Sequence, residues 1–285
     1  MRNVKACVLG LGQIGLPTAT YILRKGLGVW GYDINPITVK KAREERILNA
    51  TSNWHEIPPV DIYIICVSTI LKNDMPDLSP IFDVCEKISQ KARQSSLVSI
   101  ESTVMPGTSK KVYEKIFEKN INLVHVPHRY WAEDPARHGV KQLRVIGAVN
   151  PESLNAGLRF YRDILEIPLH VASSIEIAEM SKIAENAYRY VQIAFAEELK
   201  MICEHKGLNF NEVRNACNTK WNIEILEARD GIRGHCLPKD IQHLASLTTY
   251  NTILRSAMRV DKEYKKWLSL RLQQYRCACR KRGVS

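Results

Sequence analysis

A cysteine in a turn-rich segment is the residue of this chain best suited to covalent chemistry. Cys236 lies in Gly231-Ile-Arg-Gly-His-Cys-Leu-Pro-Lys-Asp240, between glycines and a proline rather than inside a periodic apolar run. We therefore expect an accessible thiol, whose nucleophilicity depends on nearby cations and helix ends. Arg233 and Lys239 supply positive charge, and Asp240 is placed to N-cap a helix that follows. A loop cysteine without chemistry explains this segment equally well.

A long helical pattern carries a second group of polar side chains. A Ser-x-x-Glu capping box at residues 173–176 starts the pattern, which runs to Gly207 and predicts a helix roughly 50 Å long. Lys182 and Asn186 are four residues apart and share a face with small and apolar neighbours. A partly buried lysine there could act as an acid, a base or an oxyanion partner, whereas a solvated pair with Glu179 is the alternative.

A glycine-rich turn near the N-terminus predicts a dinucleotide site. The sequence Gly10-Leu-Gly-Gln-Ile-Gly15 follows a predicted strand, residues 4–9, and opens a predicted helix, residues 16–25. Asp33 closes the next strand, residues 29–32, where an acid can accept hydrogen bonds from ribose hydroxyls. Such glycines let backbone N–H groups approach a pyrophosphate at a helix N-terminus. Because a carboxylate would repel a 2′-phosphate, we expect NAD rather than NADP.

Strands and helices alternate after this turn, which is typical of a parallel sheet. Further strands are expected at residues 61–67, 96–100, 121–126 and 144–149, and helices at residues 77–89 and 108–119. The expected fold class is α/β, with a Rossmann-like doubly wound parallel sheet over residues 1–172 and an all-helical central domain over residues 173–285.

Ligands of open parallel sheets bind outside the carboxyl ends of the strands. Thr103 stands out at such an end because Glu101 and a Pro-Gly turn flank it. The predicted cofactor-binding residues are Gly10, Gly12, Gln13, Ile14, Gly15, Asp33, Val67, Ser68, Thr69 and Thr103.

The helical second half is expected to contain a short helix over residues 209–217, with Asn209 and Glu212 as a capping box. Helices at residues 240–248 and 252–274 follow, and residues 276–282 are expected to form a frayed basic tail. Its two cysteines, spaced i and i+2, make a poor metal site, so we predict no metal.

Composition narrows the class of protein. The 285 residues suit two domains, and no apolar run is long enough to cross a membrane. Eight scattered cysteines indicate free thiols in a reducing cytoplasm. The net charge of +11 is spread along helices without a nucleic-acid signature, which favours an anionic small substrate over DNA or RNA.

The chain resembles the UDP-glucose/GDP-mannose dehydrogenase family over almost its whole length. The resemblance rests on six motifs: Gly10-x-Gly-x-Ile-Gly-Leu-Pro17, Pro76-Asp-Leu-Ser79, Glu101-Ser-Thr-Val-x-Pro-Gly107, Lys182-x-x-x-Asn186, Asn218-Thr219 and Gly234-His-Cys-Leu-Pro-Lys-Asp240. It implies NAD-linked, four-electron oxidation of a nucleotide sugar at its C6 alcohol, for polysaccharide biosynthesis.

The resemblance also implies roles for individual residues. Cys236 would form a thiohemiacetal and then a thioester, while Lys182 and Asn186 would stabilise oxyanions. Asp240 would help to control the attacking water, and Thr103 would lie beside Asp240. The substrate-binding residues would be Lys182, Asn186, Arg233 and Gly234. The thiol would face the nicotinamide, with the ammonium group of Lys182 within reach of both.

Three departures from the family pattern affect these expectations. His128 stands where the family usually has a glutamate implicated in acid/base work, so His128 or Glu133 would take that role. Arg233 replaces a glycine and would strain its loop or contact a phosphate. The sequence ends where the family continues into a third, nucleotide-binding domain, so the substrate would differ, a separate chain would supply that part, or this would be a truncated form.

Two rival hypotheses remain. One is a β-hydroxyacid-type dehydrogenase, which shares the Lys-x-x-x-Asn pairing, needs no cysteine and yields one NADH per turnover. The other is an NAD-binding partner or regulator that has lost catalysis. The long helix further predicts a homodimer.

Overall fold

The computed structural model describes residues 4–72, 75–118 and 120–281. Contacts among these residues form two compact units, the first made mainly of residues up to 182 and the second mainly of residues from 183 onward. The division falls inside the long helix α6 (Ile175–His205). The domain boundary expected after residue 172 remains a prediction.

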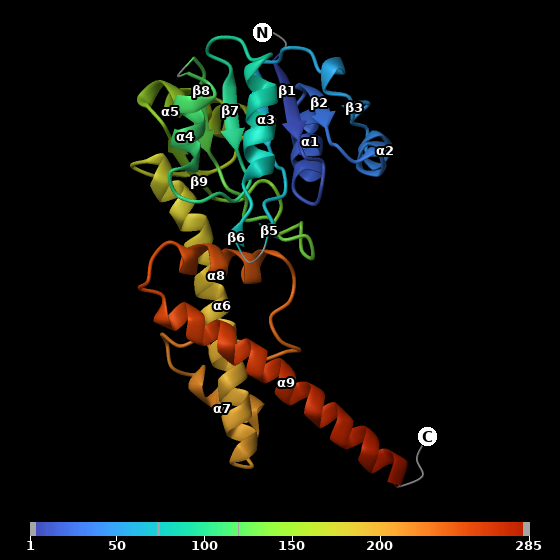
Figure 1. The fold of residues 1–285 in the computed structure, drawn as a ribbon, viewed down its shortest axis with the longest axis vertical. Helices are drawn as coiled ribbons and strands as arrows, with labels where there is room; N and C mark the ends of the chain where they lie inside the picture. Colours follow the sequence, from blue (N-terminus) through green and yellow to red (C-terminus); the bar gives the residue numbers. More distant parts are fainter. Residues whose placement is uncertain (1–3, 73–74, 119, 282–285) are drawn as a thin grey trace. The chain divides into compact units, whose positions relative to one another are not determined.

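The first unit is built on a sheet of eight strands (Figure 1). The strands are β1 (Lys5–Leu9), β2 (Gly28–Tyr32), β3 (Asn49–Thr51), β4 (Ile62–Ile65), β7 (Leu97–Ile100), β8 (Asn122–His125), β9 (Arg144–Ala148) and β10 (Leu169–Val171). Their order is β10-β9-β8-β7-β4-β1-β2-β3, so the direction of winding reverses between β1 and β4. All pairs are parallel except β8 with β9. Because β10 runs parallel to β9, these two strands oppose the other six, and the sheet is mostly parallel.

Two hydrophobic cores lie on the two faces of this sheet, as the doubly wound fold requires. One face packs against α1 (Gly15–Arg24), α2 (Pro36–Glu44), α5 (Pro151–Leu158) and a π-helical segment (Arg159–Ile164). The other face packs against α3 (Ser79–Ser89) and α4 (Thr108–Lys115). The connections also contain a 3-10 turn (Trp54–Glu56) and the short strands β5 (Leu71–Lys72) and β6 (Met75–Pro76).

The second unit is helical. It contains the greater part of α6, then α7 (Phe210–Cys217), α8 (Cys236–Ser246) and α9 (Thr252–Lys281). One core joins α6, α8 and α9 around Tyr190 and Ile241, and another joins α6, α7 and α9 around Phe210 and Tyr264. The predicted fold class, a Rossmann-like unit followed by a helical one, is confirmed. No helix in the described ranges is long and apolar enough to span a bilayer.

Several expected element ends are corrected. The Oγ of Ser174, not Ser173, accepts the hydrogen bond of Ile177 N at the start of α6, at 3.3 Å. Helix α4 ends at Lys115 rather than at residue 119, which lies outside the described residues. Helix α9 continues to Lys281, so the expected frayed tail is helical up to that residue, and residues 282–285 lie outside the description.

Two expected helix ends are confirmed. Asn209 caps α7, because its Oδ1 accepts hydrogen bonds from the backbone N–H groups of Asn211 and Glu212. Gly207 adopts a positive φ of 69° after α6, the left-handed conformation that commonly ends a helix.

Candidate active site

The glycine turn of the first unit has open space beside Gly12, where a ligand can lie, but no space for a side chain at Gly10 or Gly15. Gly10 has φ +87°, and a Cβ there would lie 2.6 Å from the carbonyl oxygen of Cys66. A Cβ on Gly15 would lie 1.7 Å from the carbonyl oxygen of Gly10, so both positions require glycine. A Cβ on Gly12, by contrast, would meet no atom within 4 Å. The turn therefore exposes backbone at the N-terminus of α1, beside Gln13 and Ile14, as a pyrophosphate requires.

Asp33 holds this turn to the end of β2. One carboxylate oxygen accepts a hydrogen bond from Leu11 N at 2.8 Å, and the other accepts one from Asn35 N at 2.8 Å. The acid predicted to meet a ribose thus also fixes the backbone of the glycine turn. These features fit a dinucleotide without a 2′-phosphate, because the carboxylate would repel that group.

The carboxyl ends of β4 and β7 are joined by hydroxyl groups. Thr69 Oγ1 donates to the carbonyl oxygen of Thr103 at 2.8 Å, and Ser102 Oγ donates to that of Val67 at 2.7 Å. Ser68 is exposed between them. The structure therefore brings Val67, Thr69 and Thr103 together at one edge of the sheet, as the sequence predicted.

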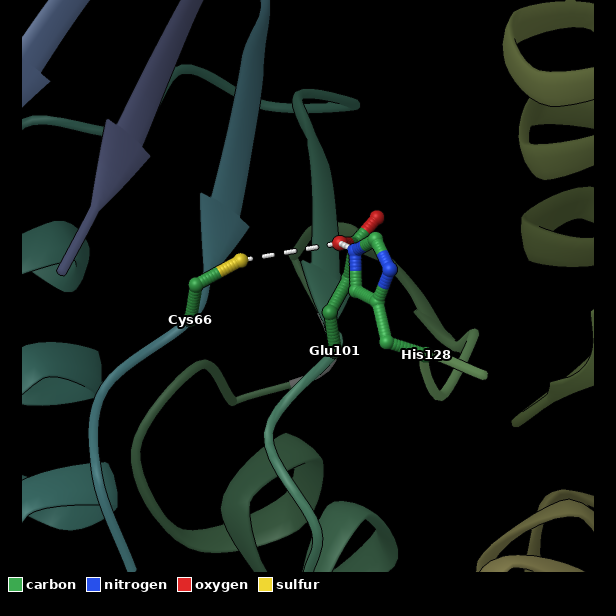
Figure 2. A group of neighbouring side chains, drawn as sticks. All are labelled: Cys66, Glu101 and His128. Carbon is green, nitrogen blue, oxygen red and sulfur yellow. Dashed lines mark hydrogen bonds and ion pairs between the residues drawn. The ribbon is translucent and has the colours of Figure 1, made fainter. Parts of the chain in front are cut away.

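A buried polar network lies beneath this edge (Figure 2). Glu101 Oε2 faces both the thiol of Cys66, at 3.5 Å, and Nε2 of His128, which donates a short hydrogen bond to it. Glu101 Oε1 lies 3.0 Å from the guanidinium group of Arg144 and also accepts a hydrogen bond from Tyr161. Arg144 and Glu101 are almost fully buried, so this ion pair is excluded from water.

The network fixes the protonation of its members. Burial raises the pKa of Glu101, but Arg144 and His128 lower it more, and the pKa is about 2. Burial and the charge of Arg144 lower the pKa of His128, so its imidazole is neutral at pH 7. Burial raises the pKa of the Cys66 thiol well above its usual range.

Cys66, Glu101 and His128 are the only group of metal-ligand type found among the described residues. Their ligand atoms already bond to one another, and the Arg144 guanidinium would repel a cation at this place. Electrostatics therefore favours the hydrogen-bonded network over a metal centre.

Two residues at the start of α6 have different roles. Glu179 is fully buried, and its carboxylate accepts hydrogen bonds from Gly107 N at 2.6 Å and Ser109 N at 2.8 Å. It therefore caps α4, although the sequence suggested a solvated pair with Lys182. Lys182 is half-buried, and its charge reaches the imidazoles of His125 and His128, where it helps to lower their pKa values.

Cys236 is the first residue of α8 and is exposed. The expectation that it lies in a loop, with Asp240 as the N-cap of a later helix, was wrong. Pro238 occupies the third position of α8, where a helix tolerates proline because that N–H has no helical partner. The thiol thus lies at a helix N-terminus, where negative charge is stabilised.

Asp240 lies one turn after Cys236 on α8 and is fully buried. Its Oδ2 accepts a hydrogen bond from the side-chain amide of Asn186 at 2.5 Å, and its Oδ1 lies 3.4 Å from Lys239 Nζ. Cys236, Asp240 and Asn186 are therefore grouped in the second unit. Arg233 and Gly234 are exposed just before them, and Gly234 has φ +83°.

Sequence reasoning missed several residues that build these groups. Arg144 and Tyr161 reach Glu101 from distant segments, and Asp261 and Lys265 of α9 contact the segment before Cys236. A charged residue that begins an otherwise apolar strand, as Arg144 does in β9, was an available signal for a buried ion pair.

Comparison with known proteins gives the family. The NAD binding domain of the UDP-glucose/GDP-mannose dehydrogenase family matches residues 37–165, and its central domain matches residues 176–263. A UDP-N-acetyl-D-mannosamine dehydrogenase of Pyrococcus horikoshii is 30% identical, over 90% of this chain and 68% of the relative. The chain belongs to the UDP-glucose/GDP-mannose dehydrogenase family. The resemblance stated from the motifs is thereby confirmed, as is NAD as the cofactor of the matching domain.

Further comparisons agree with this family. A UDP-N-acetyl-D-mannosamine dehydrogenase of Methanococcus maripaludis is 31% identical over 90% of this chain, and the chain spans 65% of that relative's length. The structure of the Pyrococcus horikoshii UDP-D-ManNAc dehydrogenase superposes with a TM-score of 0.89 at 28% identity, covering 99% of this chain and 73% of that one.

Proposed function

We propose that this chain is an NAD-dependent nucleotide-sugar 6-dehydrogenase, which oxidises a sugar C6 alcohol to a carboxylate through a thiohemiacetal and a thioester on Cys236. The observation that carries this proposal is an exposed thiol at the first residue of α8, one turn from an acid that Asn186 holds by a hydrogen bond. Membership of a family whose named relatives act on UDP-sugars supports the substrate class.

The proposed steps balance as two oxidations and one hydrolysis. The C6 alcohol loses a hydride and a proton to give an aldehyde, and the Cys236 sulfur adds to the aldehyde carbon to give a thiohemiacetal. Loss of a second hydride and a proton from that adduct leaves a thioester. Water then cleaves the carbon–sulfur bond, releasing the carboxylate and regenerating the thiol. NAD supplies the hydride acceptor, and two molecules are reduced per sugar.

The remaining residues act on charge and protons in this scheme. Lys182 and Asn186 stabilise the oxyanions that form when the thiol adds and when water attacks. Asp240 orients the water, and its buried carboxylate is positioned for this by Asn186. Thr103 lies at the nicotinamide end of the dinucleotide site, and the exposed Arg233 meets a substrate phosphate.

We assign the acid/base work of thioester hydrolysis to Glu133 in preference to His128. His128 is 5% exposed, and its Nε2 is engaged by Glu101 and lies 3.1 Å from Thr18 Oγ1. Glu133 is exposed and free to reach a ligand's water. In this assignment His128 anchors the segment that follows β8.

We also propose a homodimer formed through α6. Tyr188, Phe195 and Ile202 are seven residues apart and are 66%, 55% and 53% exposed, so they form one apolar stripe along the helix. A second copy would cover the stripe. Sedimentation should give a dimer mass for the wild type and for Glu198→Gln, and a monomer mass for Phe195→Glu. A monomeric wild type would contradict the dimer.

The enzymatic proposal is tested by NADH formation from a panel of UDP- and GDP-sugars. We expect one or a few of these sugars to reduce NAD with the wild type and none with Cys236→Ala. Cys217→Ala serves as the control, because Cys217 is also an exposed cysteine of the second unit. Equal rates for Cys236→Ala and wild type would remove the thiol from the mechanism. Calorimetry that shows no NAD binding to the wild type would remove dehydrogenase chemistry altogether, and Asp33→Ala should weaken that binding.

A further inference from the structure

The segment that leads into Cys236 is held by side chains that the proposed chemistry does not use. It turns at Gly231 and Gly234, with φ values of +86° and +83°, and buries Ile232 between them. Arg233 and Cys236 on either side of Gly234 are exposed. The position of the thiol therefore depends on how the backbone of Ile232 is fixed, four residues earlier.

Two side chains of α9 hold both polar backbone groups of Ile232. Asp261 Oδ1 accepts the hydrogen bond of Ile232 N at 2.7 Å, and Lys265 Nζ donates to the carbonyl oxygen of Ile232 at 2.7 Å. Asp261 and Lys265 are one helical turn apart and form an ion pair of 2.8 Å with each other. We call Asp261 and Lys265 the α9 clamp.

The clamp is itself supported. Tyr190 of α6 is 3% exposed and donates to Asp261 Oδ2 at 3.0 Å, which fixes the carboxylate from its far side. The aliphatic part of Lys265 packs on Gly231, since a Cβ there would lie 2.6 Å from Lys265 Cγ. Gly231 is thus required both for its positive φ and for this contact.

The start of the same segment is held from the same two helices. Tyr264 of α9 donates to the carbonyl oxygen of Arg229 at 2.7 Å, and Lys200 of α6 donates to that of Ala228 at 3.1 Å. Side chains of α6 and α9 therefore bond to the backbone at three residues between Ala228 and Ile232. So many side-chain contacts to one short backbone stretch are what a precisely held nucleophile requires.

We infer that Asp261 and Lys265 are positioning residues for the nucleophile: by fixing Ile232 they set where α8 begins and where the Cys236 thiol lies. This inference rests on the proposed role of Cys236 and adds two residues that do not touch the substrate.

The test compares Lys265→Ala with Lys266→Ala. Both remove one lysine from the same turn of α9, but only Lys265 bonds to Ile232. The first measurement is the alkylation rate of Cys236 by iodoacetamide at pH 7, followed by peptide mass spectrometry, with Cys217 of α7 as the internal reference. We expect at least a threefold change in Lys265→Ala and in Asp261→Asn, and none in Lys266→Ala. Hydrogen exchange at residues 229–236 should accelerate in the same two variants.

The second measurement separates positioning from general loss of structure. In turnover, Lys265→Ala should lower kcat at least tenfold while the KM for NAD stays within twofold, because the dinucleotide site is in the other unit. Identical alkylation in Lys265→Ala and Lys266→Ala would overturn the inference, as would a changed alkylation rate with unchanged kcat. If the wild type does not turn over, the proposed function fails, and the alkylation rates alone then decide whether the clamp positions the thiol.

Discussion

Two buried glutamates, one in each unit, differ in the pKa of their carboxyl groups. Glu101 and Glu197 are both shielded from water, at 3% and 0% exposure. Glu101 is paired with Arg144 and accepts hydrogen bonds from His128 and Tyr161, and its pKa is about 2. Burial, together with the nearby charge of Asp261, raises the pKa of Glu197 to about 8. No hydrogen-bond partner of the Glu197 carboxylate is found among the described residues.

The difference teaches that burial alone does not decide the state of a carboxyl group. Partners hold Glu101 ionised, whereas Glu197 is neutral at pH 7 because burial and Asp261 raise its pKa more than Lys265 and Lys200 lower it. The first unit thus uses an ion pair to lock the strand ends beneath the dinucleotide site. The second unit directs its charged groups, Asp261 and Lys265, toward the backbone before Cys236.

Breaking the ion pair between Glu101 and Arg144 should have the largest effect on stability. Arg144→Met leaves Glu101 buried without its cation, so the free energy of unfolding should fall by about 3–5 kcal/mol. Urea unfolding would measure this loss. The control, Arg162→Met, removes an exposed arginine and should change stability by less than about 0.5 kcal/mol. Equal stability of Arg144→Met and wild type would show that the pair does not lock the sheet.

The pH dependence of stability should separate the two glutamates. Between pH 4.5 and 8 the folded state keeps a proton on Glu197 that the unfolded state has lost, so stability falls as pH rises, by up to about 1.4 kcal/mol per pH unit. Glu197→Gln should remove this decline, whereas Glu198→Gln, on the exposed face, should keep it.

Glu101 contributes to the pH dependence of stability with the opposite sign. Its folded pKa of about 2 lies below the unfolded value, so its contribution is present above pH 4.5 and is lost as pH falls toward 2. Denaturant titrations from pH 2 to 9 would measure both changes in stability. A decline between pH 4.5 and 8 that is unchanged in Glu197→Gln would contradict a neutral Glu197.

Substitutions at two glycines of the first unit should affect stability and NAD binding differently. Gly12→Ala meets no atom of the protein, so its melting temperature should stay unchanged while NAD binds at least tenfold more weakly, which corresponds to about 1.4 kcal/mol. Gly15→Ala collides with Gly10 and should lower both quantities. Calorimetry with NAD would distinguish them, and full NAD affinity in Gly12→Ala would mean that the ligand does not approach this turn.

The smallest effect concerns the support of the clamp. Tyr190→Phe removes one hydrogen bond to Asp261, which should reduce the free energy of unfolding by about 1 kcal/mol. Lys265 still pairs with Asp261 in this variant, so the alkylation of Cys236 should change little. Tyr250→Phe, at a position that is 92% exposed, is the control. A loss above about 3 kcal/mol would show that more than this one hydrogen bond depends on the Tyr190 hydroxyl group.

Local sequence patterns predicted many elements of this structure, but they did not predict contacts between residues that are far apart in the chain. The glycine turn, Asp33 and the capping box at Asn209 are set by neighbours in the chain, and the structure has them as expected. The start of α8 was misplaced because Asp240 before an apolar run resembles an N-cap, whereas Pro238 in fact lies in the first turn of the helix. Arg144 meets Glu101 across 43 residues, a contact that depends on the antiparallel placement of β9 and leaves no periodic signal.

The yield of NADH from a limiting amount of an accepted nucleotide sugar tests the central claim most directly. Oxidation through a thioester on Cys236 predicts two NADH per sugar consumed and a carboxylate product. One NADH per sugar, with an aldehyde or ketone as the product, would contradict the account and assign the chain to single-step alcohol oxidation.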